Sequence, residues 1–209
     1  MIRYAAVLLL SLVATAAEAH PHVFVTARAD IVHGAGGTVT GVRHSWAFDD
    51  MFSSFATQGL DKDGDGAFSR EELAPLAKVN VESLKDFDYF TFVKIGGEKQ
   101  LMQPPVDYWL EFTNQVLTLH FTLPLNAPQS LGSRPLAVEI YDPTYYVAFD
   151  LAEGPAVNLI EAPPGCALSI HRASEPTPDL AAKLQIDDFA LAQQDLGAQF
   201  ANRLLVNCP

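Results

Sequence analysis

The sequence predicts an α+β fold: an antiparallel β-sandwich-like domain that carries an inserted helix-loop-helix and a C-terminal helical segment. First, apolar and polar residues alternate with a period of two in many short segments separated by Gly, Pro and Asn, which is typical of half-buried strands. Second, residues 49–60 and 70–87 instead carry apolar side chains at helical spacing. Third, 49% of the 209 residues are hydrophobic, a globular composition with enough length for one core.

The amino terminus has the pattern of a secretory signal peptide at residues 1–19. Arg3 precedes a short apolar run, and Ala17-Glu18-Ala19 forms a small-residue cleavage site. The alternative is a transmembrane anchor, but a membrane span needs about 20 apolar residues. We therefore expect cleavage before His20, export, and no stable membrane insertion of the mature chain.

The first expected strand shows the alternation most clearly. Its apolar residues fall on one face, namely Val23, Val25, Ala27, Ala29 and Ile31. Further strands are expected, in chain order, at residues 38–48, 89–95, 108–112, 116–123, 136–141, 145–151, 157–160 and 167–171. Short strands at this spacing, with turn residues between them, indicate an antiparallel sandwich.

A second helical region is expected near the carboxyl end. Thr177-Pro178-Asp179 has the pattern of a helix start with proline at the first position, and residues 189–200 are amphipathic. The chain has no internal repeat and no low-complexity segment. We therefore expect one domain over residues 20–209, with the helix-loop-helix inserted at about 49–87.

Between the two central helices, residues 61–72 match the twelve-residue EF-hand calcium loop. The candidate ligands, all oxygen donors, are Asp61, Asp63, Asp65, the carbonyl of Ala67, Ser69 through water, and Glu72. Gly66 permits the sharp turn at the sixth position, and Phe68 is apolar at the eighth. The alternative is an Asp/Gly-rich turn that rarely holds metal. A single exported loop of this kind predicts a structural calcium ion, bound with a dissociation constant on the order of 10⁻⁴ to 10⁻³ M.

The histidines suggest a second, separate metal site. Cleavage would place a free amine and an imidazole on His20, and His22 adds another imidazole, which suits zinc, nickel, cobalt or copper. The alternative is that both are merely exposed residues at the start of the chain. His44 alternates with apolar residues, which favours a buried histidine over a ligand, and His120 lies on a polar face where either role is open. His33 and His171 are expected at the surface.

Cys166 and Cys208 are the two cysteines, and an exported chain favours a disulfide between them. The alternative is a two-cysteine metal site, which no CxxC spacing supports. The segment Tyr141-Asp-Pro-Thr-Tyr-Tyr146 indicates a turn first and an aromatic partner surface second.

The formal charge of −12 excludes a nucleic-acid binder, because no basic face can be assembled, and it argues against docking on an anionic membrane. Common enzyme motifs such as GxSxG, HExxH and GxGxxG are absent from the sequence, so no catalytic activity is expected.

Five segments together resemble a bacterial family known as domain of unknown function one thousand and seven. They are residues 20–24 (HPHVF), 46–53 (WAFDDMFS), 61–72, 87–91 (FDYFT) and 141–145 (YDPTY). The resemblance implies a periplasmic protein, labelled the periplasmic component of an uncharacterised ABC-type transport system. It also implies a membrane permease of nickel/cobalt type as partner.

Three functions are therefore open. The first is a periplasmic accessory protein that hands zinc, nickel or cobalt to a membrane transporter, with His20, His22 and possible further ligands His44 and His120. The second is a calcium-stabilised interaction module without a transport role. The third is a copper protein with an N-terminal histidine site.

Overall fold

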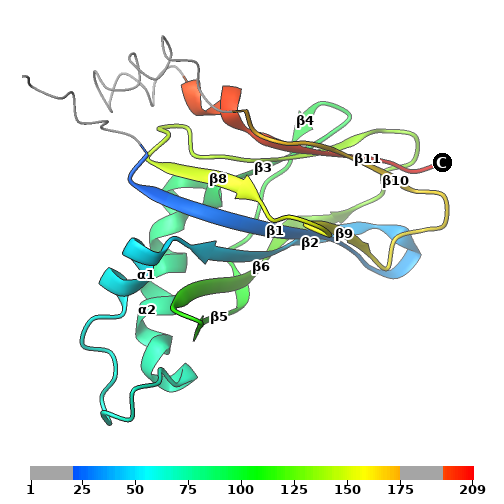
Figure 1. The fold of residues 1–209 in the computed structure, drawn as a ribbon. Coiled ribbons are helices and arrows are strands. Elements are labelled where there is room, and N and C mark those ends of the chain that lie inside the picture. Colours follow the sequence, from blue (N-terminus) through cyan, green and yellow to red (C-terminus); the bar gives the residue numbers. More distant parts are fainter. Residues whose placement is uncertain (1–20, 175–194) are drawn as a thin grey trace, which may run out of the picture.

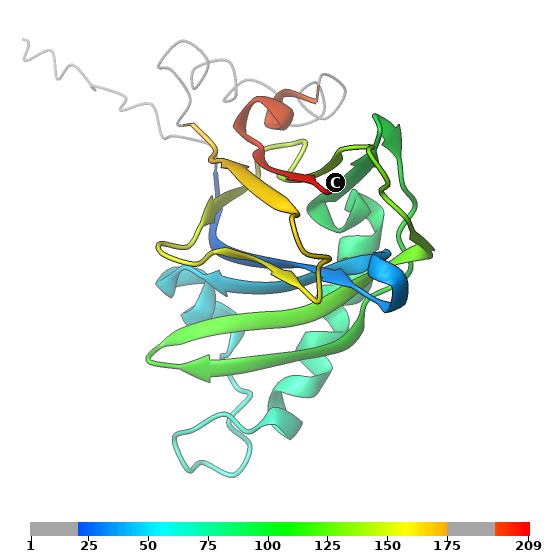
Figure 2. The same ribbon diagram turned by 90° about the vertical axis from the view of Figure 1, so that its right-hand side faces the viewer.

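The computed structural model describes residues 21–174 and 195–209, which form two β-sheets that lie face to face, with two helices beside them (Figures 1 and 2). The expected signal peptide, residues 1–19, and His20 lie outside the described residues. No helix in the described ranges is long and apolar enough to cross a membrane.

The first sheet has the strand order β5-β6-β2-β1-β8, and β9 also pairs with β1. Its strands are β1 (Val23–His33), β2 (Val39–Phe48), β5 (Val106–Thr113), β6 (Val116–Gln129), β8 (Val147–Leu151) and β9 (Val157–Ile160). The strands β1, β2, β6 and β5 are antiparallel neighbours, but β8 and β9 run parallel to β1. The expected antiparallel pairing therefore holds for β5, β6, β2 and β1 but is wrong for β8 and β9, because the chain enters β8 from the other sheet rather than through a hairpin.

The second sheet has the order β10-β11-β7-β3-β4. Its strands are β3 (Thr91–Ile95), β4 (Glu98–Lys99), β7 (Leu136–Ile140), β10 (Ala167–His171) and β11 (Asn202–Asn207). The disulfide between Cys166 and Cys208 joins the outer ends of β10 and β11, as expected. The strand β11 is not among the expected strands, since the helical expectation ends at residue 200 and the residues after it are assigned no element. Residues 175–194 lie outside the described ranges, and only a short 3-10 turn, η3 (Leu196–Phe200), precedes β11.

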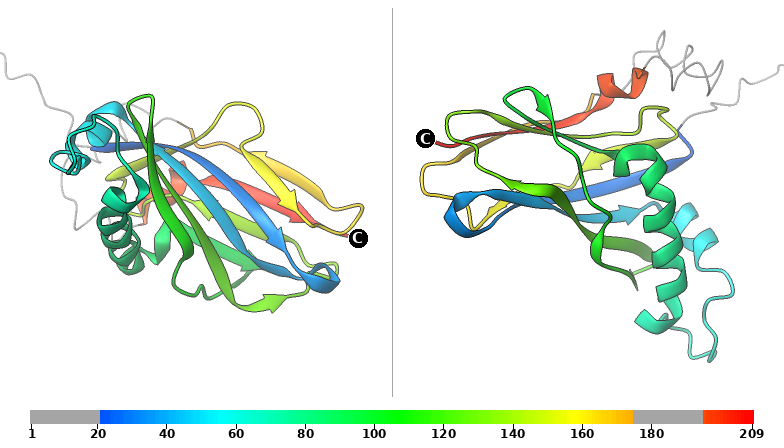
Figure 3. Two further views of the ribbon diagram at one scale, coloured as in Figure 1. Left: turned by 90° about the horizontal axis from the view of Figure 1, so that it is seen from below. Right: turned by 180° about the vertical axis from the view of Figure 1, so that it is seen from behind.

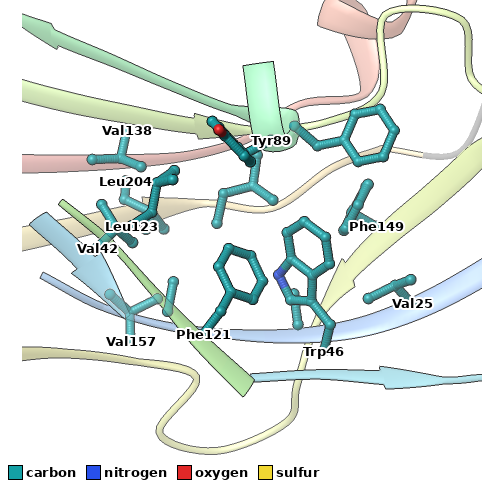
Figure 4. Close-up of a cluster of buried hydrophobic side chains, with 14 of the residues drawn as sticks. Val25, Val42, Trp46, Tyr89, Phe121, Leu123, Val138, Phe149, Val157 and Leu204 are labelled. Atoms are coloured by element: carbon teal, nitrogen blue, oxygen red, sulfur yellow. The ribbon is translucent and has the colours of Figure 1, made fainter. Parts of the chain in front are cut away.

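The core lies between the sheets, and aromatic rings fill one end of it (Figure 4). Trp46 of β2 is 1% exposed, and its ring centroid lies 4.8 Å from that of Phe121 and 4.9 Å from that of Phe149. The alternation predicted for β1 is confirmed, because its odd-numbered residues from Val23 to Ile31 are all buried.

The helices α1 (Asp50–Ala56) and α2 (Arg70–Ser83) flank the loop 61–72, and α2 packs against β5 (Figure 3). Both are shorter than expected. Thr57 ends α1, where its hydroxyl donates to the carbonyl of Ser53 at 2.8 Å. Residues 84–90 form a 3-10 segment, η2 (Leu84–Phe90), in which Phe87, Asp88 and Tyr89 depart from helical backbone angles. A further 3-10 turn, η1 (Ala35–Gly37), joins β1 to β2.

Candidate functional site

The loop 61–72 gathers three carboxylates at its exposed end. Oxygen atoms of Asp61, Asp63 and Asp65 all lie within 4.8 Å of one another. Backbone N–H groups of the loop hold them: Gly64 and Gly66 donate to the two oxygens of Asp61 at 2.7 and 3.1 Å. These three are the only group of three or more His, Cys, Asp or Glu residues close enough to share an ion within residues 21–174 and 195–209. Carboxylate and carbonyl oxygens are the donors that Ca²⁺ prefers, so the chemistry of the donor set fits that ion.

Glu72 caps the start of α2, a role that its place in the calcium motif does not reveal. One carboxylate oxygen accepts from the backbone N–H of Lys62 at 2.7 Å, and the other accepts from the N–H and hydroxyl of Ser69. The Ser69 hydroxyl in turn caps the N–H of Glu72, so the pair forms a capping box at the start of α2. These hydrogen bonds lower the pKa of Glu72 to about 2. The spacing Ser-x-x-Glu is the sequence pattern from which this cap could have been predicted.

Two side chains from the end of the loop anchor it to the first sheet. Phe68 packs on Phe112 of β5, with ring centroids 4.9 Å apart. The guanidinium of Arg70 lies 4.7 Å from the ring centre of Trp109 on the same strand. The three aspartates therefore project from a loop whose carboxyl end is held in place.

His44 is a buried core residue, 1% exposed. The indole N–H of Trp46 donates to its Nδ1 at 3.2 Å, so Nε2 carries the proton and faces the hydroxyl of Thr91, also at 3.2 Å. Burial lowers the pKa of His44 to about 3, which keeps the ring neutral. With both ring nitrogens engaged, His44 presents no lone pair to a metal.

The other candidate histidine ligands lie apart. In the register of the first sheet, His120 of β6 lies opposite Ser45 of β2, and Ser45 lies opposite Arg28 of β1. Arg28 is six residues along the chain from the exposed His22. At about 3.3 Å per residue, His22 and His120 are separated by about 20 Å along the sheet. The structure therefore does not bring His22, His44 and His120 together. The expectation that His33 lies at the surface is wrong: it is 1% exposed and its Nδ1 lies 3.1 Å from the carbonyl of Ile160. His171 is exposed, as expected.

His120 belongs to a polar hollow of about 470 Å³ on the outer face of the first sheet. Its ring stacks on Trp109 with centroids 4.7 Å apart, and its Nε2 lies 3.1 Å from a carboxylate oxygen of Glu111. The charged residues that line the hollow are Arg28, Asp30, Arg43 and Asp107. Because both signs of charge are present, the hollow favours no one class of ligand.

Sequence reasoning missed an apolar cavity of about 500 Å³ at one end of the sandwich. It is bounded by the inner face of the first sheet and by side chains of α1, α2 and η2. Four of the five segments quoted above meet there, represented by Val23, Trp46, Phe87 and Asp142. The signal that could have found it is the aromatic content shared by these segments.

The comparisons with known proteins identify the family. A family model described as "Protein of unknown function (DUF1007)" matches residues 5–208. An uncharacterized protein of Haemophilus influenzae is 25% identical over 196 residues, which cover 91% of each chain. An uncharacterized 15.5 kDa protein of Spirochaeta aurantia is 31% identical over 86 residues, which cover 41% of this chain and 61% of that protein. The family match spans nearly the whole sequence, and the chain therefore belongs to this family of proteins of unknown function.

Proposed function

We propose that the protein is an exported calcium-binding module, in which the EF-hand-type loop 61–72 holds one Ca²⁺. The observation that carries the proposal is the cluster of Asp61, Asp63 and Asp65 oxygens within 4.8 Å, at the first, third and fifth positions of the motif, where it places oxygen ligands. The carbonyl of Ala67 and the side chains of Ser69 and Glu72 complete the donor set in the proposal. The ion stabilises the start of α2, because the last two ligands also cap that helix.

The net charge supports a cation site, because a formal charge of −12 raises the local concentration of divalent cations. Three negative charges held close together repel one another, and a bound divalent ion removes that repulsion. Calcium therefore acts here as a stabilising ion for an accessory or interaction module, which is the second of the three functions considered from the sequence.

The test is thermal unfolding of the purified protein with and without calcium. At a calcium concentration ten times the dissociation constant, the free energy of unfolding is expected to rise by about 1.4 kcal/mol. Asp63→Ala should abolish this gain, because it removes the side-chain oxygens of a ligand outside the capping box. Glu71→Ala is the matched control, because it removes an exposed carboxylate of the same loop that is not a candidate ligand, and it should retain the calcium response. An equal calcium response in the wild type and in Asp63→Ala contradicts the proposal.

A second candidate is delivery of zinc, nickel or cobalt to a membrane permease through His20 and His22. It is supported by the exposure of His22 at the residue before β1, where the chain enters the first sheet. In this proposal His120 and His44 contribute no ligand. Calorimetry with zinc, nickel and copper on protein that begins at His20 should show binding that His22→Ala weakens at least tenfold, while the calcium response is unchanged. Identical affinities with and without His22 remove the candidate.

A further inference from the structure

The walls of the apolar cavity are rich in aromatic side chains. Seven of its lining residues carry aromatic rings: Trp46, Phe48, Phe52, Phe87, Phe90, Tyr146 and Phe149. Phe90 and Phe149 pack with centroids 5.5 Å apart, and Phe48 and Phe52 with centroids 4.6 Å apart. Figure 4 shows Val25, Trp46 and Phe149 together at this end of the core. The cavity therefore continues the hydrophobic core rather than the polar surface.

The cavity opens to solvent. Phe87 and Tyr146 both line it, and they are 45% and 47% exposed. Exposed aromatic rings at the mouth of an apolar hollow lose hydrophobic stabilisation unless something covers them. The volume of about 500 Å³ lies within the range of small-molecule sites, roughly 300 to 1,000 Å³.

The charges that line the cavity disfavour anionic ligands. None of the residues that line the cavity is Lys, Arg or His. Asp142 lines it, is 3% exposed, and accepts hydrogen bonds from Thr144 and from the N–H of Val147. No ion pair joins Asp142 to a basic side chain in the described part of the chain. An anionic ligand would thus meet a buried negative charge and no positive one.

We propose that this cavity binds a hydrophobic small molecule that is uncharged or cationic, and that it rejects anionic amphiphiles. The aromatic walls supply the apolar contact, and they attract a cationic group through the faces of their rings. The proposal goes beyond calcium binding, because the loop 61–72 contributes no residue to the cavity.

The experiment uses three probes with the same ten-carbon chain: 1-decanol, decylamine and decanoate, at pH 7. The sequence contains two tryptophans, and Trp46 lines the cavity whereas Trp109 lies on the outer face of the first sheet. A Trp109→Phe background therefore makes the fluorescence report the cavity alone. Decanol and decylamine should shift the emission of Trp46 and bind at least tenfold more tightly than decanoate. Decanoate binding as tight as that of decanol, or no binding of any probe, overturns the proposal.

Two pairs of variants locate the binding and test the charge argument. Phe87→Ala should weaken decanol binding at least threefold, whereas Phe55→Ala, at a residue that is 72% exposed and outside the cavity, should not. Ser83→Lys adds a positive charge among the lining residues and should improve decanoate binding at least threefold. Val79→Lys adds the same charge on α2 outside the lining and should leave decanoate binding unchanged.

Each measurement is repeated with and without calcium, so that failure of the loop proposal is distinguishable from failure of this one. Sedimentation measures the oligomeric state and so tests the alternative that a second copy of the chain covers the cavity. If the wild type is a dimer that Phe87→Ala dissociates, and none of the probes binds, a second copy of the chain covers the mouth and the ligand proposal is wrong.

Discussion

The acidic loop and the apolar cavity are built in opposite ways. The loop consists of twelve consecutive residues, and its hydrogen bonds are almost all internal, such as that from the Gly66 N–H to Asp61. The cavity takes side chains from β1, β2, α1, α2, η2, β6 and the segment 142–149. A local motif can therefore be recognised from spacing alone, whereas the cavity exists only once distant segments have packed.

The helix α2 joins the two regions. Its first turn is capped by Ser69 and Glu72 of the loop, and its carboxyl end contributes Asn80 and Ser83 to the cavity. Between these ends, its buried residues pack into the core, which includes Leu73 at 0% exposure. The loop and the cavity thus share a support, although neither contributes residues to the other.

The largest expected effect is a loss of stability on replacement of Trp46, which lines the cavity. Trp46→Ala should lower the free energy of unfolding by about 4 kcal/mol, because it removes a ring that is 1% exposed and leaves the Nδ1 of His44 without its donor. Chemical denaturation measures the loss. Trp109→Ala, on the outer face, is the control and should cost clearly less. Equal losses would show that the cavity wall is no more important to stability than the solvent-facing side of the sheet.

The pH dependence of stability tests the core at His44, which is buried beside Trp46. Burial lowers its pKa to about 3, so between pH 6.5 and 3 the unfolded chain binds a proton that the folded chain does not. Stability should therefore be complete above about pH 6.5 and fall with decreasing pH, by up to about 1.4 kcal/mol per pH unit. Urea midpoints between pH 7 and 5 measure the slope. His44→Gln should flatten it, and the exposed His171→Gln should leave it unchanged; a slope that survives His44→Gln refutes the assignment.

The smallest expected effects belong to the loop in the absence of calcium. Ser69→Ala should lower the free energy of unfolding by about 1 kcal/mol, because the N–H groups at the start of α2 lose their cap. Asp63→Asn should change it by less than about 0.5 kcal/mol, since Asp63 is exposed. Thermal unfolding in a chelator measures both. A larger loss for Asp63→Asn than for Ser69→Ala would mean that the carboxylate cluster, not the capping box, holds the loop.

Much of the local structure could be predicted from the sequence. The strands β9 and β10 begin and end where the alternation and turn residues indicated, at Val157–Ile160 and Ala167–His171. The disulfide between Cys166 and Cys208 followed from the expectation of export. Side-chain alternation and the tendency of cysteines in exported proteins to form disulfides are properties of a few residues. They can therefore be recognised without knowing which distant segments pack together.

The sequence correctly favoured burial of His44 and exposure of His171, but the tertiary structure alone decided the direction of β8 and β9, the strand β11, and the burial of His33. An isolated sequence segment does not specify which neighbour it pairs with: β11 lies between β10 and β7, and β8 aligns with β1. From its residue type the imidazole of His44 is a candidate metal ligand, but in the core both of its nitrogens are engaged in hydrogen bonds with Trp46 and Thr91. Hydrogen-bond partners and burial depend on residues far apart in the chain, and the cavity around Asp142 arises from the same long-range packing.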